Sequence, residues 1–132
     1  MLGLTFKPNT DDMRSAPSLT IVPALQAAGA EVVAFDPKGI AAARPLLPGV
    51  TFAQSPYEAI AGAHALVIIT EWEAFRALDL QRVKASMRQP IVVDLRNIYR
   101  PDEMAALGFD YHCIGRAPLR DRGSENVARA AE

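Results

Sequence analysis

Short apolar runs at regular intervals are the feature that most constrains the fold of this chain. Between them lie longer stretches whose apolar residues recur at helical spacing, a pattern typical of a parallel sheet covered by helices. The strands predicted from these runs are Leu2–Thr5, Glu31–Phe35, Val50–Phe52, Ala65–Ile69, Ile91–Asp94 and Asp110–Cys113.

Helices are predicted in the gaps between these strands. The first is expected to run from Pro17 or Ser18 to Ala28, and the others at Gly39–Leu46, Pro56–Ala61, Glu73–Leu78, Leu80–Ser86 and Pro101–Leu107. Ser15 or Ser18 is expected to cap the first helix, and Ser55 introduces the third. The alternation predicts a three-layer α/β fold, a Rossmann-like, doubly wound, mostly parallel six-stranded sheet with helices on both faces.

Composition bounds the organisation and the partners of this chain. With 132 residues and 50% hydrophobic content, it can bury one core, so we expect one domain over residues 1–116 and a partly ordered tail over 117–132. The 14 basic and 15 acidic side chains leave no bulk charge that favours nucleic acid or a membrane surface. The single cysteine and the absence of a long apolar run predict a soluble, cytoplasmic protein.

The first predicted strand is short for a central strand, and a polar loop follows it. We therefore expect the chain to be a domain excised from a longer protein. The loop within Gly3–Arg14 lacks the Gly-x-Gly-x-x-Gly turn that lets a backbone approach a pyrophosphate. Any anion site at this end of the sheet must therefore rely on side chains.

Three cations are expected at the edge of the sheet where the strands end. Lys7 and Arg14 lie on the loop after the first strand, and Arg96 follows the fifth strand. Because ligands of doubly wound folds bind beyond the carboxyl ends of the strands, these cations suit a diphosphate. From spacing alone, they can equally be solvated charges or partners of nearby aspartates.

Other polar residues at the strand ends are open to two interpretations. Asp36 ends the second strand, where an acid can hold a ribose, but Asp before Pro favours a turn. Thr70, Glu71 and Trp72 follow the fourth strand and are a possible cleft, although the tryptophan ring also suits the core. His64, His112 and Cys113 show no metal-ligand spacing, so no metal site is predicted.

Several motifs occur together in one order and spacing. They are Gly-Leu-Thr-Phe-Lys-Pro-Asn-Thr-Asp-Asp-Met-Arg-Ser from Gly3, Phe35-Asp-Pro, Thr70-Glu-Trp-Glu-Ala-Phe, Val93-Asp-Leu-Arg-Asn, Gly108-Phe and Tyr111-x-x-Ile-Gly-Arg116. In this combination the chain resembles the C-terminal, UDP-binding domain of the UDP-glucose 6-dehydrogenase family.

The resemblance implies a function and a division of roles. Members of the family oxidise the C6 alcohol of UDP-glucose to a carboxylate with two NAD⁺, in a cleft between two Rossmann-type domains joined by a dimerising helix. By resemblance, Lys7 and Arg96 contact the UDP-sugar, and Arg14 faces NAD⁺ bound mainly by the N-terminal domain. Thr70, Glu71 and Trp72 are implied to lie near the cleft.

The sequence also departs from the family pattern. The glycine-rich NAD⁺ turn, the catalytic cysteine and the central helix are missing, and Cys113 does not match the nucleophile. We therefore expect no catalytic residue and no activity in this chain without the missing N-terminal domain and dimerisation helix. The alternatives are the same domain of a UDP-ManNAc or GDP-mannose dehydrogenase, or a stand-alone nucleotide-binding regulatory module.

Overall fold

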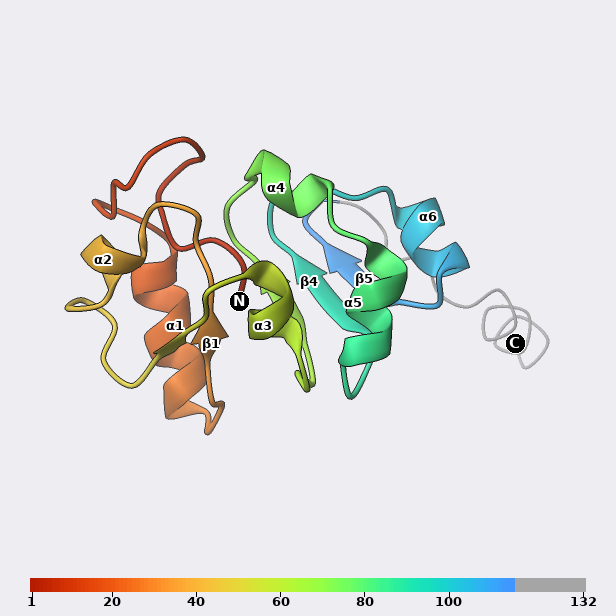
Figure 1. Cartoon of the computed structure of the whole chain (residues 1–132), viewed down its shortest axis with the longest axis horizontal. Coiled ribbons are helices and arrows are strands. Elements are labelled where there is room, and N and C mark those ends of the chain that lie inside the picture. The colour runs from red at the N-terminus through yellow and green to blue at the C-terminus, as the bar shows by residue number, and fades with distance from the viewer. Residues whose placement is uncertain (116–132) are drawn as a thin grey trace.

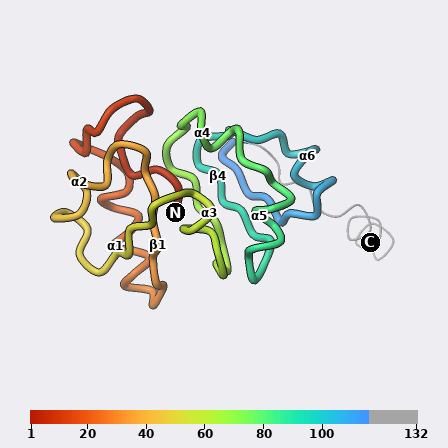
Figure 2. The backbone as a smooth tube through the Cα atoms, viewed as in Figure 1, coloured from red at the N-terminus to blue at the C-terminus, as the bar shows by residue number. Residues whose placement is uncertain are grey.

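The computed structural model describes residues 1–115, and Figures 1 and 2 show its course. Arg116 and the predicted tail 117–132 lie outside the described residues. The strands are β1 (Val33–Ala34), β2 (Thr51–Phe52), β3 (Leu66–Ile68), β4 (Ile91–Asp94) and β5 (Asp110–Cys113). The helices are α1 (Ser18–Ala27), α2 (Ile40–Ala43), α3 (Pro56–Ile60), α4 (Glu73–Arg76), α5 (Leu80–Ser86) and α6 (Pro101–Ala106).

All strand pairs are parallel, in two sheets with the orders β1-β2 and β3-β4-β5. Leu2 joins the two sheets, because it forms isolated parallel bridges with both Phe35 and Ile68. The N-terminus accordingly lies in the middle of the molecule, between β1 and β3 (Figures 1 and 2). When the segment at Leu2 is counted first, the spatial order is that of a doubly wound Rossmann-type sheet. The α/β class is therefore confirmed.

The predicted six-stranded sheet is not confirmed, because the expected strand Leu2–Thr5 is reduced to the bridges of Leu2. Two features end it. Gly3 has φ +88°, which turns the backbone away from an extended course. The N–H groups of Leu4 and Thr5 then donate to the carboxylate of Asp36 instead of to a neighbouring strand.

The two faces of the sheet carry separate hydrophobic cores. Successive strand residues point to opposite faces, so Leu66 and Ile68 pack in one cluster while Ile69 belongs to the other. The first cluster takes its helical residues from α3, α4, α5 and α6. The second takes them from α1 and α2. Helices therefore cover both faces, as the sequence predicted.

The structure tests the N-cap residues that were predicted for α1 and α3. Ser55 caps α3 as predicted, since its hydroxyl accepts a hydrogen bond from the N–H of Glu58 at 3.1 Å. The prediction that Ser15 or Ser18 caps α1 was wrong, because the N-cap position is Pro17. The Ser18 hydroxyl is buried and donates to the carbonyl of Leu4 at 2.6 Å, which fixes α1 against the first loop. Within residues 1–115, no helix has the length and apolar character that a membrane crossing requires.

Candidate functional site

The loops after Leu2 and β3 meet at the point where the sheet changes direction. From Leu2 the chain crosses to β1 through α1, whereas from β3 it crosses to β4 over the other face, and both loops lie at the top of Figure 1. The Thr70 hydroxyl donates to the carbonyl of Thr5 at 2.8 Å. A Cβ placed on Gly3 would lie 2.6 Å from that of Thr70, so only glycine fits this approach. Such a switch point is where doubly wound folds bind ligands.

Asp36 holds this region together from the end of β1. Its side chain is buried, and one oxygen accepts hydrogen bonds from the N–H groups of Leu4 and Thr5 and from the Thr5 hydroxyl, at 2.8, 3.0 and 3.1 Å. The other oxygen accepts from the N–H groups of Lys38 and Gly39 at 2.9 and 2.7 Å. The turn interpretation of Asp36 is therefore confirmed, and its oxygens are already engaged by the protein.

Lys7 and Arg14 lie on the first loop, which is closed by a hydrogen bond from the Phe6 N–H to the Asp12 carbonyl. Lys7 is exposed, and its carbonyl lies 3.1 Å from the Thr5 hydroxyl, whose single proton is shared between this carbonyl and Asp36. The exposed Arg14 guanidinium grips the Asp12 carboxylate through Nε and Nη2, at 3.1 and 3.0 Å. The hydrogen bonds from Arg14 lower the pKa of Asp12, and the same contact raises the pKa of Arg14.

Arg96 follows β4 and reaches across to the end of β3. Its N–H donates to Asp94 at 3.0 Å, and its Nε donates to the carbonyl of Ile69. The same Nε lies 3.6 Å from a carboxylate oxygen of Glu71, and both side chains are 32% exposed. Since Ile69 precedes Thr70, which contacts the first loop, Arg96 and the loop of Lys7 adjoin the same stretch of chain.

The other two candidates after β3 are enclosed. The Thr70 side chain is fully buried in its contact with the first loop. The Trp72 ring packs in the larger core, and within residues 1–115 its buried Nε1 has no hydrogen-bond partner. Of the three predicted cleft residues, Glu71 alone is partly accessible in this structure.

Asp94 is a second buried carboxylate that fixes a loop, and sequence reasoning considered it only as a partner for a cation. It accepts from the N–H groups of Ile98 and Tyr99 at 2.8 and 3.2 Å, and from the Tyr111 hydroxyl at 2.5 Å. Burial and the hydrogen bond to Asp94 raise the pKa of Tyr111 far above its ordinary value. The Val-Val-Asp motif at the end of an apolar strand was the available signal for this role.

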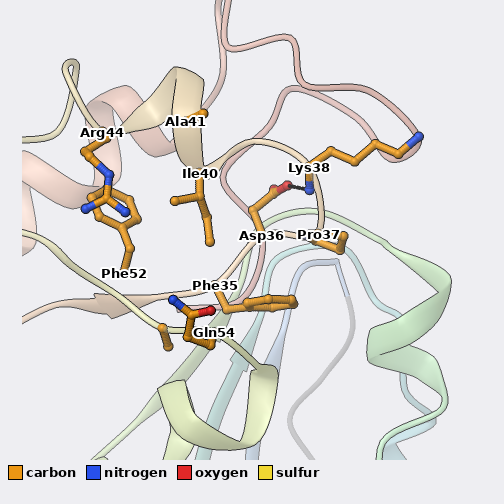
Figure 3. A pocket seen from close by; sticks show the side chains of 10 residues that line it. Phe35, Asp36, Pro37, Lys38, Ile40, Ala41, Arg44, Phe52 and Gln54 are labelled. Atoms are coloured by element: carbon orange, nitrogen blue, oxygen red, sulfur yellow. Dashed lines mark hydrogen bonds between the residues drawn. The ribbon is translucent and has the colours of Figure 1, made fainter.

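A hollow of about 400 Å³ lies at the carboxyl ends of β1 and β2 (Figure 3). Its walls include Phe35, Ile40 and Phe52, and the Arg44 guanidinium stacks 4.9 Å from the centre of the Phe52 ring. Asp36 contributes to the wall, but the backbone N–H groups already occupy its oxygens. Among the described residues, no group of three or more metal-ligating side chains is gathered.

These features define a doubly wound α/β domain with a polar rim at its topological switch point. The chain belongs to the UDP-glucose/GDP-mannose dehydrogenase family, whose UDP binding domain matches residues 1–101. A UDP-glucose 6-dehydrogenase of Rhizobium meliloti (strain 1021) is 60% identical over 116 residues, which cover 88% of this chain and 26% of that protein. A second UDP-glucose 6-dehydrogenase, from Pseudomonas aeruginosa, is 50% identical over 120 residues, covering 86% and 26%.

Solved structures show the same likeness. The crystal structure of an NDP-N-acetyl-D-galactosaminuronic acid dehydrogenase from Methanosarcina mazei Go1 matches with a TM-score of 0.76 and 32% identity, covering 88% of this chain and 24% of that one. A UDP-glucose dehydrogenase from Pyrobaculum islandicum matches with a TM-score of 0.69 and 30% identity, covering 88% and 24%. The chain thus spans about a quarter of the length of the proteins that it matches.

Proposed function

We propose that this chain is the UDP-sugar-binding domain of a UDP-glucose 6-dehydrogenase, which oxidises UDP-glucose to UDP-glucuronate with NAD⁺. The 60% identity to a UDP-glucose 6-dehydrogenase supports this choice of sugar nucleotide. In this proposal residues 1–116 form the binding domain, and an N-terminal NAD-binding domain and a dimerisation helix complete the enzyme. The single cysteine fits a cytoplasmic location.

The position of the Arg96 guanidinium is the observation that carries the proposal. Among residues 1–115, its Nε donates to the Ile69 carbonyl and lies 3.6 Å from a carboxylate oxygen of Glu71. Within residues 1–115, no hydrogen bond engages its terminal nitrogens, Nη1 and Nη2. These two donors suit bidentate binding of a diphosphate, and the exposed Lys7 would supply a second positive charge from the neighbouring loop.

The residues of this chain do not fit NAD⁺ bound in the usual Rossmann manner. The first loop lacks closely spaced glycines, and the N–H groups of Leu4 and Thr5 donate to Asp36 and not to a phosphate. Asp36 in turn has no oxygen left for a ribose. In the proposal, the exposed Arg14 faces NAD⁺ that the other domain holds, and Asp12 orients its guanidinium.

The chain holds no group that we assign to the chemical step. Cys113 is half-buried at the end of β5 and packs against the larger core. Oxidation of the sugar through a covalent thiol adduct needs a thiolate placed against C6. We therefore expect the 132-residue chain to bind the substrate nucleotide without turning it over. Steady NADH formation from UDP-glucose and NAD⁺ by the pure chain would contradict this assignment.

A second candidate is the same domain in a dehydrogenase for another nucleotide sugar. A UDP-D-ManNAc dehydrogenase from Pyrococcus horikoshii has a matching structure, with a TM-score of 0.71 and 31% identity over 89% of this chain and 25% of that one. Its fold therefore fits as well as that of a glucose enzyme. Titration of the chain with UDP and with GDP tests the GDP-mannose alternative, because our proposal requires that UDP binds more tightly.

Titration with UDP at low salt, followed by NMR, tests the site itself. We expect shifts to concentrate in residues 5–14 and 69–72 and around Arg96. Arg96→Ala removes a charge-assisted contact of about 1.5–3 kcal/mol, so the dissociation constant should rise about 10- to 100-fold. Lys7→Ala should weaken binding in the same direction, because it removes the other proposed cation.

Arg88→Ala is the matched control for this titration. Arg88 is exposed and precedes β4, at the opposite edge of the sheet from Arg96. The Arg88→Ala substitution removes the same charge as Arg96→Ala. It should change UDP affinity by less than about twofold, because salt screens the attraction between a distant charge and the ligand. Equal losses in the Arg88 and Arg96 variants, or no UDP binding by the wild-type chain, would overturn the proposed site.

A further inference from the structure

The contacts of Arg96 leave a specific orientation of its guanidinium. The Ile69 carbonyl accepts the Nε–H, and the Glu71 carboxylate lies 3.6 Å from the same nitrogen. That separation is too long for a hydrogen bond, so the carboxylate acts on Arg96 through charge attraction. Within residues 1–115 no hydrogen bond engages Nη1 or Nη2, so the edge of the planar guanidinium that these two nitrogens form is open to a ligand.

The Glu71–Arg96 pair is also partly shielded from solvent. Both side chains are 32% exposed, whereas the neighbouring Glu73 side chain is 91% exposed and pairs with Arg76 at 3.8 Å. Solvent and salt therefore screen the attraction between Glu71 and Arg96 less than that of the exposed pair. Arg96 is in addition fixed at its backbone, where its N–H donates to Asp94. Backbone and side chain of Arg96 are thus held separately.

We propose that Glu71 is a positioning residue that aims the terminal nitrogens of Arg96 at the diphosphate of a bound nucleotide sugar. The proposal rests on the proposed function and adds a role for a residue that does not itself bind the ligand. An unrestrained arginine has several rotatable bonds, and ordering it on binding weakens affinity. By holding Arg96, Glu71 orders the guanidinium already in the ligand-free protein, so less conformational freedom is lost when the ligand binds.

The negative charge of Glu71 lets the direction of the change in UDP affinity distinguish its possible roles. A carboxylate beside a diphosphate repels it, so the loss of this charge alone should strengthen binding. If Glu71 instead competed with the ligand for Arg96, its loss would strengthen binding further. Among these electrostatic roles, only positioning of Arg96 predicts that removal of the Glu71 charge weakens binding.

Glu71→Gln is therefore compared with Glu73→Gln, which removes the same charge two residues away. We expect the dissociation constant for UDP to rise about two- to fivefold in Glu71→Gln, the range of a partly screened ion pair. Glu73→Gln should change it less than about twofold. Thermal unfolding of each variant near the wild-type temperature shows that the fold is kept.

A double-mutant cycle separates positioning from a structural role of Glu71. In an Arg96→Ala background there is no guanidinium to aim, so Glu71→Gln should leave UDP affinity unchanged or improve it. A general disturbance of the loop would weaken binding in both backgrounds. Equal weakening in both backgrounds, or tighter binding by Glu71→Gln alone, overturns the proposal.

A ligand-free measurement distinguishes failure of this inference from failure of the proposed function. The ¹⁵N order parameter of Arg96 Nε should fall in Glu71→Gln and stay unchanged in Glu73→Gln. An unchanged order parameter in Glu71→Gln overturns positioning even if UDP binds through Arg96. Failure of the wild-type chain to bind UDP would instead remove the proposed function, and the inference with it.

Discussion

Replacement of Asp36 by asparagine tests whether one buried carboxylate holds the first loop in place. The carboxylate is 2% exposed and accepts five hydrogen bonds, three on one oxygen and two on the other. Asp36→Asn keeps the size and shape of the side chain but leaves one acceptor oxygen. The substitution therefore changes hydrogen bonding with almost no change in packing.

The structure sets the smallest loss that the variant can suffer. If the new NH₂ group takes the place of the oxygen that serves Lys38 and Gly39, the buried N–H of Gly39 and the part-buried N–H of Lys38 lose their acceptor. The other orientation affects the N–H groups of Leu4 and Thr5 and the Thr5 hydroxyl. Each buried donor left without an acceptor costs about 1–3 kcal/mol. We therefore expect the free energy of unfolding to fall by about 3 kcal/mol, a large part of a typical domain's stability.

Urea unfolding at neutral pH measures this loss. Trp72 is the single tryptophan of the sequence and is buried, so its fluorescence reports unfolding of the larger core. Asp79→Asn is the matched control. Asp79 caps α5 with one oxygen, which accepts from the N–H groups of Gln81 and Arg82 at 3.1 and 3.2 Å. Asparagine caps helices as well as aspartate does, so the control should lose less than about 0.5 kcal/mol.

Equal losses in the two variants would refute the argument from oxygen count. A loss below about 1 kcal/mol in Asp36→Asn would do the same, because even one unsatisfied buried donor costs that much. Loss of stability with an unchanged first loop, seen as unshifted amide resonances for residues 4–14, would place the effect elsewhere. Each of these results would show that the hydrogen bonds of Asp36 do not hold the first loop in the way argued above.

A further prediction concerns Gly3, which approaches Thr70 at the start of the first loop. Gly3→Ala should cost about 3 kcal/mol through its φ of +88° and its contact with Thr70. Gly62→Ala has φ +71° but open space around it, so it should show only the backbone part, and equal losses would argue against the contact.

The sequence predicted the bounds of β4 and β5 correctly, but it did not predict where the first strand ends. β4 and β5 have the predicted bounds, because each is a four-residue segment paired along its length with its neighbour. The first strand was expected at Leu2–Thr5, but Asp36, more than 30 residues away, takes the N–H groups that would have continued it. A long-range side-chain acceptor of this kind leaves no periodic signal in the sequence.

The same limit applies to caps and to the candidate site. Ser55 was recognised because its partner is three residues away, while Ser18 was misassigned because its hydroxyl bonds Leu4 across the fold. The rule for doubly wound sheets pointed to the loops after Leu2, β3 and β4. It could not show that Glu71 contacts Arg96, since that contact depends on how two loops pack.

The use of backbone donors at the rim explains why this site needs positioned side chains. In a glycine-rich turn, N–H groups bind the phosphate, and the helix that follows holds them rigidly in place. Here the N–H groups of Leu4 and Thr5 are consumed by Asp36, so positive charge must come from long, flexible side chains. Flexible cations lose affinity unless they are ordered before the ligand arrives. The contact of Glu71 with Arg96 would therefore do here what the glycine turn does elsewhere, which is to hold the phosphate-binding donors in place before the ligand binds.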